Sequence, residues 1–306
     1  MSPLFRTLTR VGLNALQFLA ADTACRVGGS LGVLAWRLGV RRRLVSRTME
    51  QTLGLRGAVR ARLARRSYAT MGANFLEIWT AGGVDGVERH AWLANPTWAK
   101  HLQATNRSFV MATLHIGSWD GALIGGRVSW TRALAYAKAQ HNETMDAMLN
   151  ERRKITGAEV LLTRQGDRTG AVTVMKALRS GAVVGLLADQ RPRRDEGIAA
   201  RFLGVATWCH PGPAFFADRA GVLVVPAFAL RIRAGQTKIY VLRPFTVAGL
   251  SSAAGTQRVM EALSAVVAAF PGQYFWHHRR FTDTPESCPD ADPRWRTGVA
   301  FLAQTR

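Results

Sequence analysis

The sequence predicts an α/β fold in which a mostly parallel central sheet is flanked by helices and preceded by an N-terminal helical segment. Short apolar runs rich in β-branched residues alternate with segments of helical periodicity, which is typical of strand–helix–strand units. Polar side chains follow two of these runs directly. The chain has 306 residues and 48% hydrophobic residues, so it can bury a sizeable core.

The apolar runs and the periodic segments give the expected elements in order. A helix is expected over residues 57–80, where apolar residues recur at helical spacing between arginines. Strands are then expected at 109–114, 133–139, 159–163, 182–188, 222–230 and 238–244, and helices at 121–128, 143–154, 168–179, 213–220 and 256–270. Pro226 lies inside an expected strand, so we predict that this strand is bulged or at a sheet edge.

Residues 1–50 are expected to form a membrane-associating helical segment, and residues 51–306 the α/β domain. Two apolar stretches, Leu13–Ala24 and Val27–Leu38, are interrupted by Asp22 and Arg26, so no uncharged run reaches the 18 residues typical of a transmembrane helix. We therefore favour a helix on the membrane surface. An arginine cluster follows at positions 37–47 and would favour anionic lipids on the cytoplasmic side. The alternative is a buried helical hairpin with a solvated basic end.

The net charge of +21 and the isoelectric point near 11.5 restrict the possible partners. Arginine contributes most of the positive charge, and its planar guanidinium suits phosphate and carboxylate groups. Nucleic acid, an anionic membrane, a phosphorylated lipid and an acidic carrier protein are all candidates. The arginines are scattered and no nucleic-acid-reading motif appears, so a nucleic acid partner is not expected.

The cysteines and histidines do not suggest a metal centre or a disulfide framework. Cys25, Cys209 and Cys288 are widely spaced, odd in number, and not arranged with histidines at zinc-binding intervals. This pattern fits a reducing compartment, and neither a metal nor a cofactor is expected.

The sequence HIGSWD at residues 115–120 is the main candidate for catalysis. His115 directly follows the expected strand 109–114, and Asp120 follows it at the spacing His-x4-Asp. On a regular helix the two side chains would diverge by about 140°, because each residue turns by about 100°. They can meet only if His115 precedes the helix, and a strand-to-helix turn provides that geometry at the edge where open sheets bind ligands.

A neutral imidazole that is oriented by a carboxylate can remove a proton from a hydroxyl group. The motif does not require a nucleophilic Ser or Cys, so the simplest chemistry is direct attack of a substrate hydroxyl on an acyl donor. Backbone N–H groups around Gly117 are candidates to stabilise the resulting oxyanion. Trp119 could line an acyl groove or pack in the core. From spacing alone, a histidine that caps a helix beside a solvated acid remains a competing interpretation.

Three other groups of polar residues could contribute to the same site. Asp189 and Gln190 end the expected strand 182–188, and in a parallel sheet they could share a crevice with His115. Arg152 and Arg153 could clamp a phosphate or complement the end of a helix. The basic run 277–280 could bind phosphate or pack at an edge.

Taken together, six segments in this order resemble the late acyltransferases of bacterial lipid A biosynthesis, over about residues 8–281. They are LAWRLGVRRRLVSRTMEQTLG, LHIGSWD, RRKITG, KALRSGAVVGLLADQ, RFLGVATWCHPGPAFFADRAGVLVVPAFALR and PGQYFWHHRRF. The resemblance implies that His115 is the general base and that Asp120 is its partner. It also implies that Arg153 and Asp189 are site residues, with Arg152 a possible substitute for Arg153.

The expected function is therefore membrane-associated O-acyl transfer to a hydroxyl of a lipid A precursor. The resemblance implies an acyl carrier protein thioester or acyl coenzyme A as co-substrate, an anionic lipid as acceptor, and the cytoplasmic face of the bacterial inner membrane as location. Related members of the family acylate other membrane lipids, so another phospholipid or glycolipid acceptor is the first alternative. A non-catalytic basic protein that binds membranes or nucleic acid is the alternative from another class.

Overall fold

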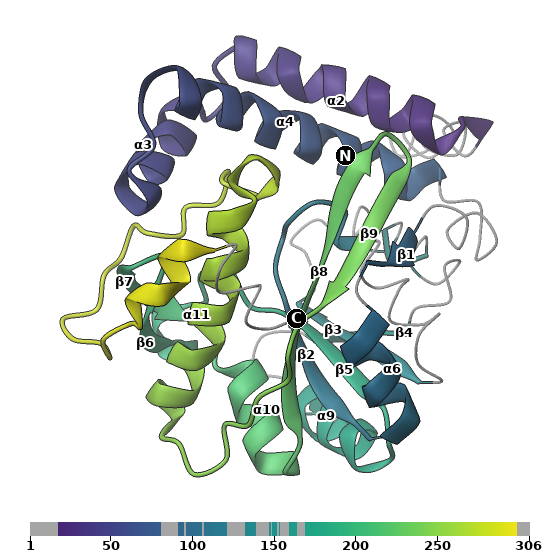
Figure 1. Ribbon diagram of the computed structural model, residues 1–306, viewed down its shortest axis with the longest axis vertical. Helices are drawn as coiled ribbons and strands as arrows, with labels where there is room; N and C mark the ends of the chain where they lie inside the picture. The colour runs from purple at the N-terminus through teal and green to yellow at the C-terminus, as the bar shows by residue number, and fades with distance from the viewer. Residues whose placement is uncertain are drawn as a thin grey trace.

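The computed structural model describes residues 18–80, 91–94, 96–105, 107–120, 132–138, 147, 149–151, 153, 159–163 and 169–298. Two helices predicted from the sequence, 121–128 and most of 143–154, lie outside these residues. The central feature is a seven-stranded sheet with the order β1-β9-β8-β2-β5-β3-β4 (Figure 1).

The sheet is mostly parallel, as the sequence predicts. Its strands are β1 (Ala91–Leu93), β2 (Phe109–Thr113), β3 (Ala133–Lys138), β4 (Glu159–Thr163), β5 (Val183–Leu187), β8 (Leu223–Arg233) and β9 (Gln236–Val241). All neighbouring pairs are parallel except β8 and β9, which form an antiparallel hairpin. The carboxyl ends of β2 and β5 therefore lie next to each other, and this is where the sequence places His115 and Asp189.

Alternate residues of β2 pack on opposite faces of the sheet. Phe109 and Met111 contact the apolar cluster that includes α6 (Pro96–Thr105), whereas Val110 and Ala112 belong to the main core. The helices α9 (Thr169–Arg179), α10 (Gly212–Ala220) and α11 (Ser252–Ala269) contribute to the main core. Burial on both faces explains why the strand sequences are continuous apolar runs.

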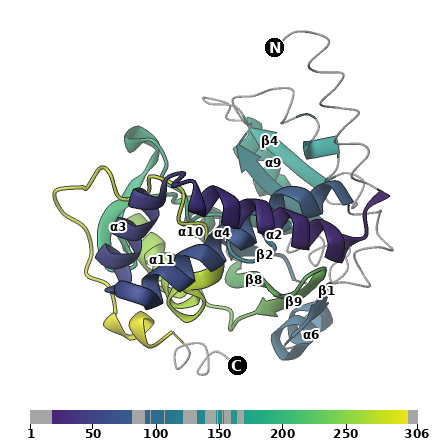
Figure 2. The ribbon, with the colours of Figure 1, turned by 90° about the horizontal axis from the view of Figure 1, so that it is seen from above.

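Three helices precede the sheet: α2 (Ala21–Arg37), α3 (Arg42–Leu53) and α4 (Gly57–Thr80). Figures 1 and 2 show α2 and α4 side by side beyond the tip of the β8–β9 hairpin. Glycines permit this close approach, because a Cβ atom at Gly32 would lie 2.0 Å from the Tyr68 carbonyl oxygen and one at Gly28 would lie 2.3 Å from that of Gly72.

The exposed side of α2 carries an apolar stripe. Val27, Leu31, Leu34 and Leu38 are all exposed, and their spacing places them on one face of the helix. Exposed arginines at positions 37, 41, 42, 43 and 47 lie at the end of the stripe and along α3. Among the described residues, no helix combines the length and the apolarity needed to cross a bilayer.

Pro226 does not have the position predicted from the sequence. Its strand, β8, lies inside the sheet between β9 and β2, and the register irregularity occurs between Arg231 and Arg233. Pro226 is instead the last residue of β8 paired with β2, and Ala227 is the first paired with β9. The missing N–H group of proline is tolerated because the strand changes partners at this point.

The structure also contains elements that the sequence pattern did not reveal. Strands β6 (Ile198–Phe202) and β7 (Val205–Cys209) form a separate antiparallel hairpin, and 3₁₀ turns occupy Arg194–Glu196, Pro271–Gln273 and Pro293–Thr297. The hairpin turn uses Leu203 and Gly204, both with positive φ. The tract 198–209 has neither an Asn-Gly nor an Asp-Gly turn signal, which explains why it was missed.

Candidate functional site

His115 lies just beyond the end of β2 and is held by its backbone and by its ring. Its carbonyl oxygen accepts a hydrogen bond from the Phe275 N–H at 3.0 Å. The imidazole contacts the rings of Trp119 and Phe275, with centroid separations of 5.4 and 6.0 Å. The half-buried Trp119 therefore forms part of an aromatic wall around the histidine.

The carboxylate bonded to His115 is Asp189. His115 Nδ1 lies 2.8 Å from Asp189 Oδ1, and Asp189 is 1% exposed. Burial opposes ionisation, but His115 and then Arg280 keep the pKa of Asp189 below its usual range. An ionised Asp189 accepts a hydrogen bond from Nδ1–H, which leaves the Nε2 lone pair of a neutral imidazole available as a base.

Asp120 has a different partner. Its Oδ1 atom accepts a hydrogen bond from Arg153 Nε at 3.0 Å, and Arg153 Nη1 donates to Asn150 Oδ1 at 3.2 Å. The structure thus joins the four site residues predicted from the sequence into two pairs, His115–Asp189 and Asp120–Arg153. Arg152 lies outside the described residues.

The turn after His115 is shaped by Gly117. This residue has φ +56°, and a Cβ atom there would lie 2.0 Å from the Ala229 carbonyl oxygen, so only glycine fits. Its N–H donates to the Gln273 carbonyl at 3.0 Å, and the Ser118 N–H donates to that of Ala229 at 3.1 Å. The N–H groups of Gly117 and Ser118, which belong to the region suggested for oxyanion donors, are therefore already engaged within the protein.

A largely buried ion pair supports this turn from the side of the N-terminal helices. Arg231 on β8 donates to both carboxylate oxygens of Glu77 on α4, at 2.8 and 2.7 Å. Glu77 in turn accepts a hydrogen bond from Ser118 Oγ at 3.0 Å, and Asn74 bonds both Arg231 and the Gly117 carbonyl. Burial opposes ionisation of Glu77, but Arg231 and its hydrogen bonds keep the Glu77 pKa below normal.

The segment after α11 forms the opposite support. Arg280 is 3% exposed and donates to the carbonyl oxygens of Gln190 and Trp208. Its guanidinium also lies over the Phe202 ring. Arg280 therefore fixes the chain just after Asp189, and the basic run 277–280 is in part a buried structural support.

His277 in the same run is also buried. Its ring packs edge-on against Tyr68 and stacks on Phe275, and neither ring nitrogen has a hydrogen-bond partner among the described residues. Burial, assisted by Arg41, lowers the pKa of His277 to about 4. Its surroundings give it a packing role.

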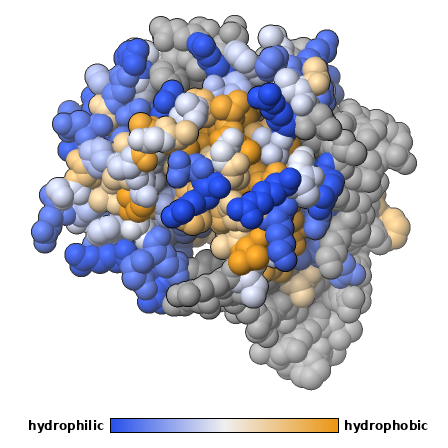
Figure 3. Space-filling view, turned by 90° about the horizontal axis from the view of Figure 1, so that it is seen from below, coloured by the Kyte–Doolittle hydropathy of each residue, from blue (hydrophilic) through white to orange (hydrophobic). Residues whose placement is uncertain are grey.

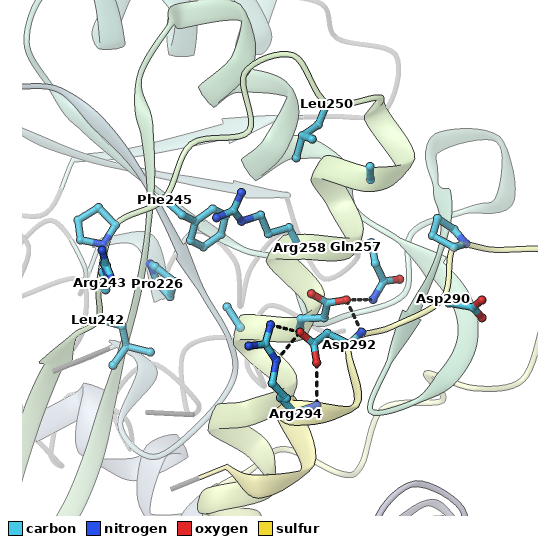
Figure 4. A pocket seen from close by; sticks show the side chains of 15 residues that line it. Pro226, Leu242, Arg243, Phe245, Leu250, Gln257, Arg258, Asp290, Asp292 and Arg294 are labelled. Carbon is cyan, nitrogen blue, oxygen red and sulfur yellow. Dashed lines mark hydrogen bonds and ion pairs between the residues drawn. The ribbon is translucent and has the colours of Figure 1, made fainter. Parts of the chain in front are cut away.

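A cavity lies apart from the residues around His115. It has a volume of about 690 Å³ and lies between the loop after β9 and α11, where Arg258 covers the Phe245 ring (Figure 4). On its other side Glu261 accepts hydrogen bonds from Gln257 and the Asp292 N–H. At the same rim Arg294 pairs with Asp292.

The face opposite α2 and α4 has an apolar centre within a hydrophilic surround (Figure 3). Exposed apolar residues of the described chain away from the N-terminal helices include Phe215, Leu223 and Leu250. None of the polar site residues described above belongs to this apolar group.

The arrangement around His115 supplies a base, an ionised partner and a fixed turn. Among the described residues, no group of three or more His, Cys, Asp or Glu side chains could hold a metal ion. Sequence reasoning missed Glu77 and Arg231, and it named the run 277–280 without singling out Arg280, since a buried charged residue has no local signature.

Comparison with known proteins gives the family. No curated protein matches the sequence. The sequence model of the bacterial lipid A biosynthesis acyltransferase family matches residues 5–283, which include every residue of the two pairs and their supports. The chain therefore belongs to the bacterial lipid A biosynthesis acyltransferases, and it is an enzyme that transfers acyl groups.

Proposed function

We propose that the enzyme transfers a fatty acyl chain from an acyl carrier protein thioester to a hydroxyl of a lipid A precursor, with His115 as general base and Asp189 as its orienting partner. The observation that carries this proposal is the 2.8 Å contact between His115 Nδ1 and the buried Asp189 carboxylate. It leaves His115 Nε2 as the basic atom.

The reaction balances without a covalent enzyme intermediate. The acceptor hydroxyl gives its proton to His115 Nε2 while its oxygen forms a bond to the thioester carbonyl carbon. The tetrahedral oxyanion then collapses, the C–S bond breaks, and the departing thiolate takes the proton back from His115. Asp189 stabilises the imidazolium that forms between these two proton transfers.

Asp120 and Arg153 would bind the acceptor instead of acting on the proton. Arg153 is largely buried and fixed by Asp120 and Asn150, so its orientation is set before any ligand arrives. A fixed guanidinium suits a phosphate group of the acceptor. The positive charge of the whole chain would favour both an anionic lipid surface and an acidic carrier.

The apolar stripe on α2 provides a means of membrane association. Four exposed apolar side chains in one line, with arginines at the end of the helix, suit insertion into the interface of an anionic leaflet. We propose the cytoplasmic face of the bacterial inner membrane, where acyl carrier protein is present.

The test is acyl transfer by the purified enzyme in detergent micelles, with a panel of acyl carrier protein thioesters and a lipid A precursor. Transfer by the wild type and its loss in His115→Ala would support the proposal, and the panel would reveal the preferred chain length. Transfer only with acyl coenzyme A would change the donor. Transfer only to another phospholipid or glycolipid would change the acceptor.

Membrane binding is tested separately with vesicles that contain phosphatidylglycerol. The double variant Leu31→Gln/Leu34→Gln should lose most of its vesicle binding. Val172→Gln on α9 is the matched control, because Val172 is similarly exposed but remote in the sequence. Equal binding by both variants would exclude the stripe as the membrane contact.

A further inference from the structure

The lone pair of the base is not free in the structure, because the side chain of Gln190 occupies it. Gln190 Nε2 lies 3.3 Å from His115 Nε2. Since Nδ1–H of a neutral imidazole donates to Asp189, Nε2 is the acceptor in this contact and the Gln190 amide is the donor. A hydroxyl that gives its proton to His115 must therefore displace this amide.

The main chain of Gln190 is anchored while its side chain is exchangeable. Its carbonyl oxygen accepts a hydrogen bond from the buried Arg280, and Asp189 precedes it at the end of β5. The amide can move away from Nε2 by side-chain rotation alone. The hydroxyl oxygen then occupies the position next to Nε2, and the thioester carbon that it attacks lies about 3 Å from this oxygen. The displaced Gln190 amide therefore remains close to the thioester carbonyl.

The thioester oxygen needs a donor, and two amides that directly follow the His115–Ile116 step are engaged elsewhere. The N–H groups of Gly117 and Ser118 donate to Gln273 and Ala229, as described above. A primary amide has two N–H donors, and a donor aimed at a developing oxyanion contributes strongly to rate.

We propose that Gln190 caps His115 Nε2 in the free enzyme, is displaced by the acceptor hydroxyl, and then donates a hydrogen bond to the thioester oxygen as negative charge develops there. The capping of His115 Nε2 rests on the observed contact, and the donation to the thioester oxygen rests on the proposed acyl transfer. Gln190 would thus be a catalytic residue that responds to acceptor binding.

The two halves are tested by two readouts on Gln190→Met, which keeps the length of the side chain and removes both donors. The first readout needs no substrate: diethyl pyrocarbonate acylates an imidazole nitrogen and releases ethanol and carbon dioxide. Modification of His115, followed by peptide mass spectrometry, should be several-fold faster in the variant, because Nε2 is uncapped and Nδ1 is still covered by Asp189.

The second readout is the transfer assay. We expect kcat to fall by about 10²-fold, the usual effect of losing one oxyanion donor, while KM for the acceptor is unchanged or lower. Gln51→Met on the exposed surface of α3 is the control and should alter neither readout. Thermal unfolding checks that both variants fold.

Unchanged modification of His115 in a folded Gln190→Met protein would overturn the cap, and a kcat within threefold of wild type would overturn the donor. If the wild type transfers no acyl group to any acceptor, the proposed function fails, whereas the modification rates still decide the cap independently.

Discussion

The Asp189 carboxylate and the His115 imidazole meet at 2.8 Å although 74 positions separate them in the sequence. They meet because β2 and β5 are adjacent parallel strands in register, with Thr113 opposite Leu187. His115 and Asp189 each lie two residues beyond the end of their own strand, so the pairing of the strands brings them together.

Asp189→Asn should lower kcat by about 10²- to 10⁴-fold with little change in KM, because the amide no longer holds the basic tautomer of His115 or stabilises the imidazolium. Steady-state transfer kinetics provide the measurement. Asp218→Asn, at an exposed position on α10, is the control. Wild-type turnover in Asp189→Asn would remove Asp189 from the mechanism.

Asp120 and Arg153 should behave as one unit. If Asp120 acts by fixing Arg153, then Asp120→Asn and Arg153→Met should each raise KM for a phosphorylated acceptor, and the double variant should be no worse than the poorer single variant. A double-mutant cycle on kcat/KM measures this coupling. Additive losses, with the Asp120 effect confined to kcat, would instead favour a direct action of Asp120 on His115.

The buried pair of Glu77 and Arg231 gives a stability prediction. Glu77→Gln leaves the Arg231 charge without its carboxylate, and we expect a loss of about 3–5 kcal/mol in the free energy of unfolding. The double variant Glu77→Gln/Arg231→Met should recover part of that loss. Denaturant unfolding in detergent is the measurement. If the losses of unfolding free energy from the two substitutions were equal and additive, Glu77 and Arg231 would not stabilise the protein as a pair.

The buried His277 should make the protein less stable at acidic pH. Its folded pKa of about 4 lies below the ordinary 6.5, so the unfolded chain takes up the proton first. Stability therefore falls as the pH decreases from 6.5 to 4, by up to about 1.4 kcal/mol per pH unit for this residue. The neighbouring His278, whose pKa burial also lowers to about 4, adds a similar slope.

His277→Phe should remove one of these two slopes while it keeps the ring contacts with Tyr68 and Phe275. Unfolding free energies measured at intervals between pH 4 and 7 would show a shallower dependence than in the wild type. An unchanged slope would mean that His277 does not remain neutral in the folded protein.

Two glycines on α2 form a matched pair for packing. Gly32→Ala should destabilise the protein, by about 1–3 kcal/mol or more, since the new Cβ atom would lie 2.0 Å from the Tyr68 carbonyl oxygen. At Gly29 the nearest atom would be 3.6 Å away, so Gly29→Ala should be tolerated or stabilising by up to about 1 kcal/mol. Thermal unfolding distinguishes them, and equal effects would contradict the close packing.

Sequence reasoning succeeded for strands that are buried on both faces, because continuous apolar runs such as 109–114 and 182–188 have few other interpretations. It also placed His115 and Asp189 at strand ends that share an edge. It failed for Pro226, because the sequence does not record where a strand changes partners. The pairing of His115 with Asp189 depends on strand order, which spacing along the chain does not contain.

The supports of the site illustrate the same limit. Arg231 and Arg280 resemble the other arginines of a strongly basic chain until the fold buries them against Glu77 and beside Asp189. Burial of a charge is a tertiary property, so local patterns do not predict which arginines it affects.

The dependence of Gln190 on Arg280 has a consequence for biosynthesis. The β2 end of the site is made early in translation, but its backbone partners Gln273 and Phe275, and Arg280 after them, emerge from the ribosome about 160 residues later. The nascent chain can thus expose the apolar stripe of α2 to a membrane long before His115 is held by these contacts. The chain would thus attach to the membrane before its site is assembled, and an incomplete chain would reach the lipid surface without being reactive.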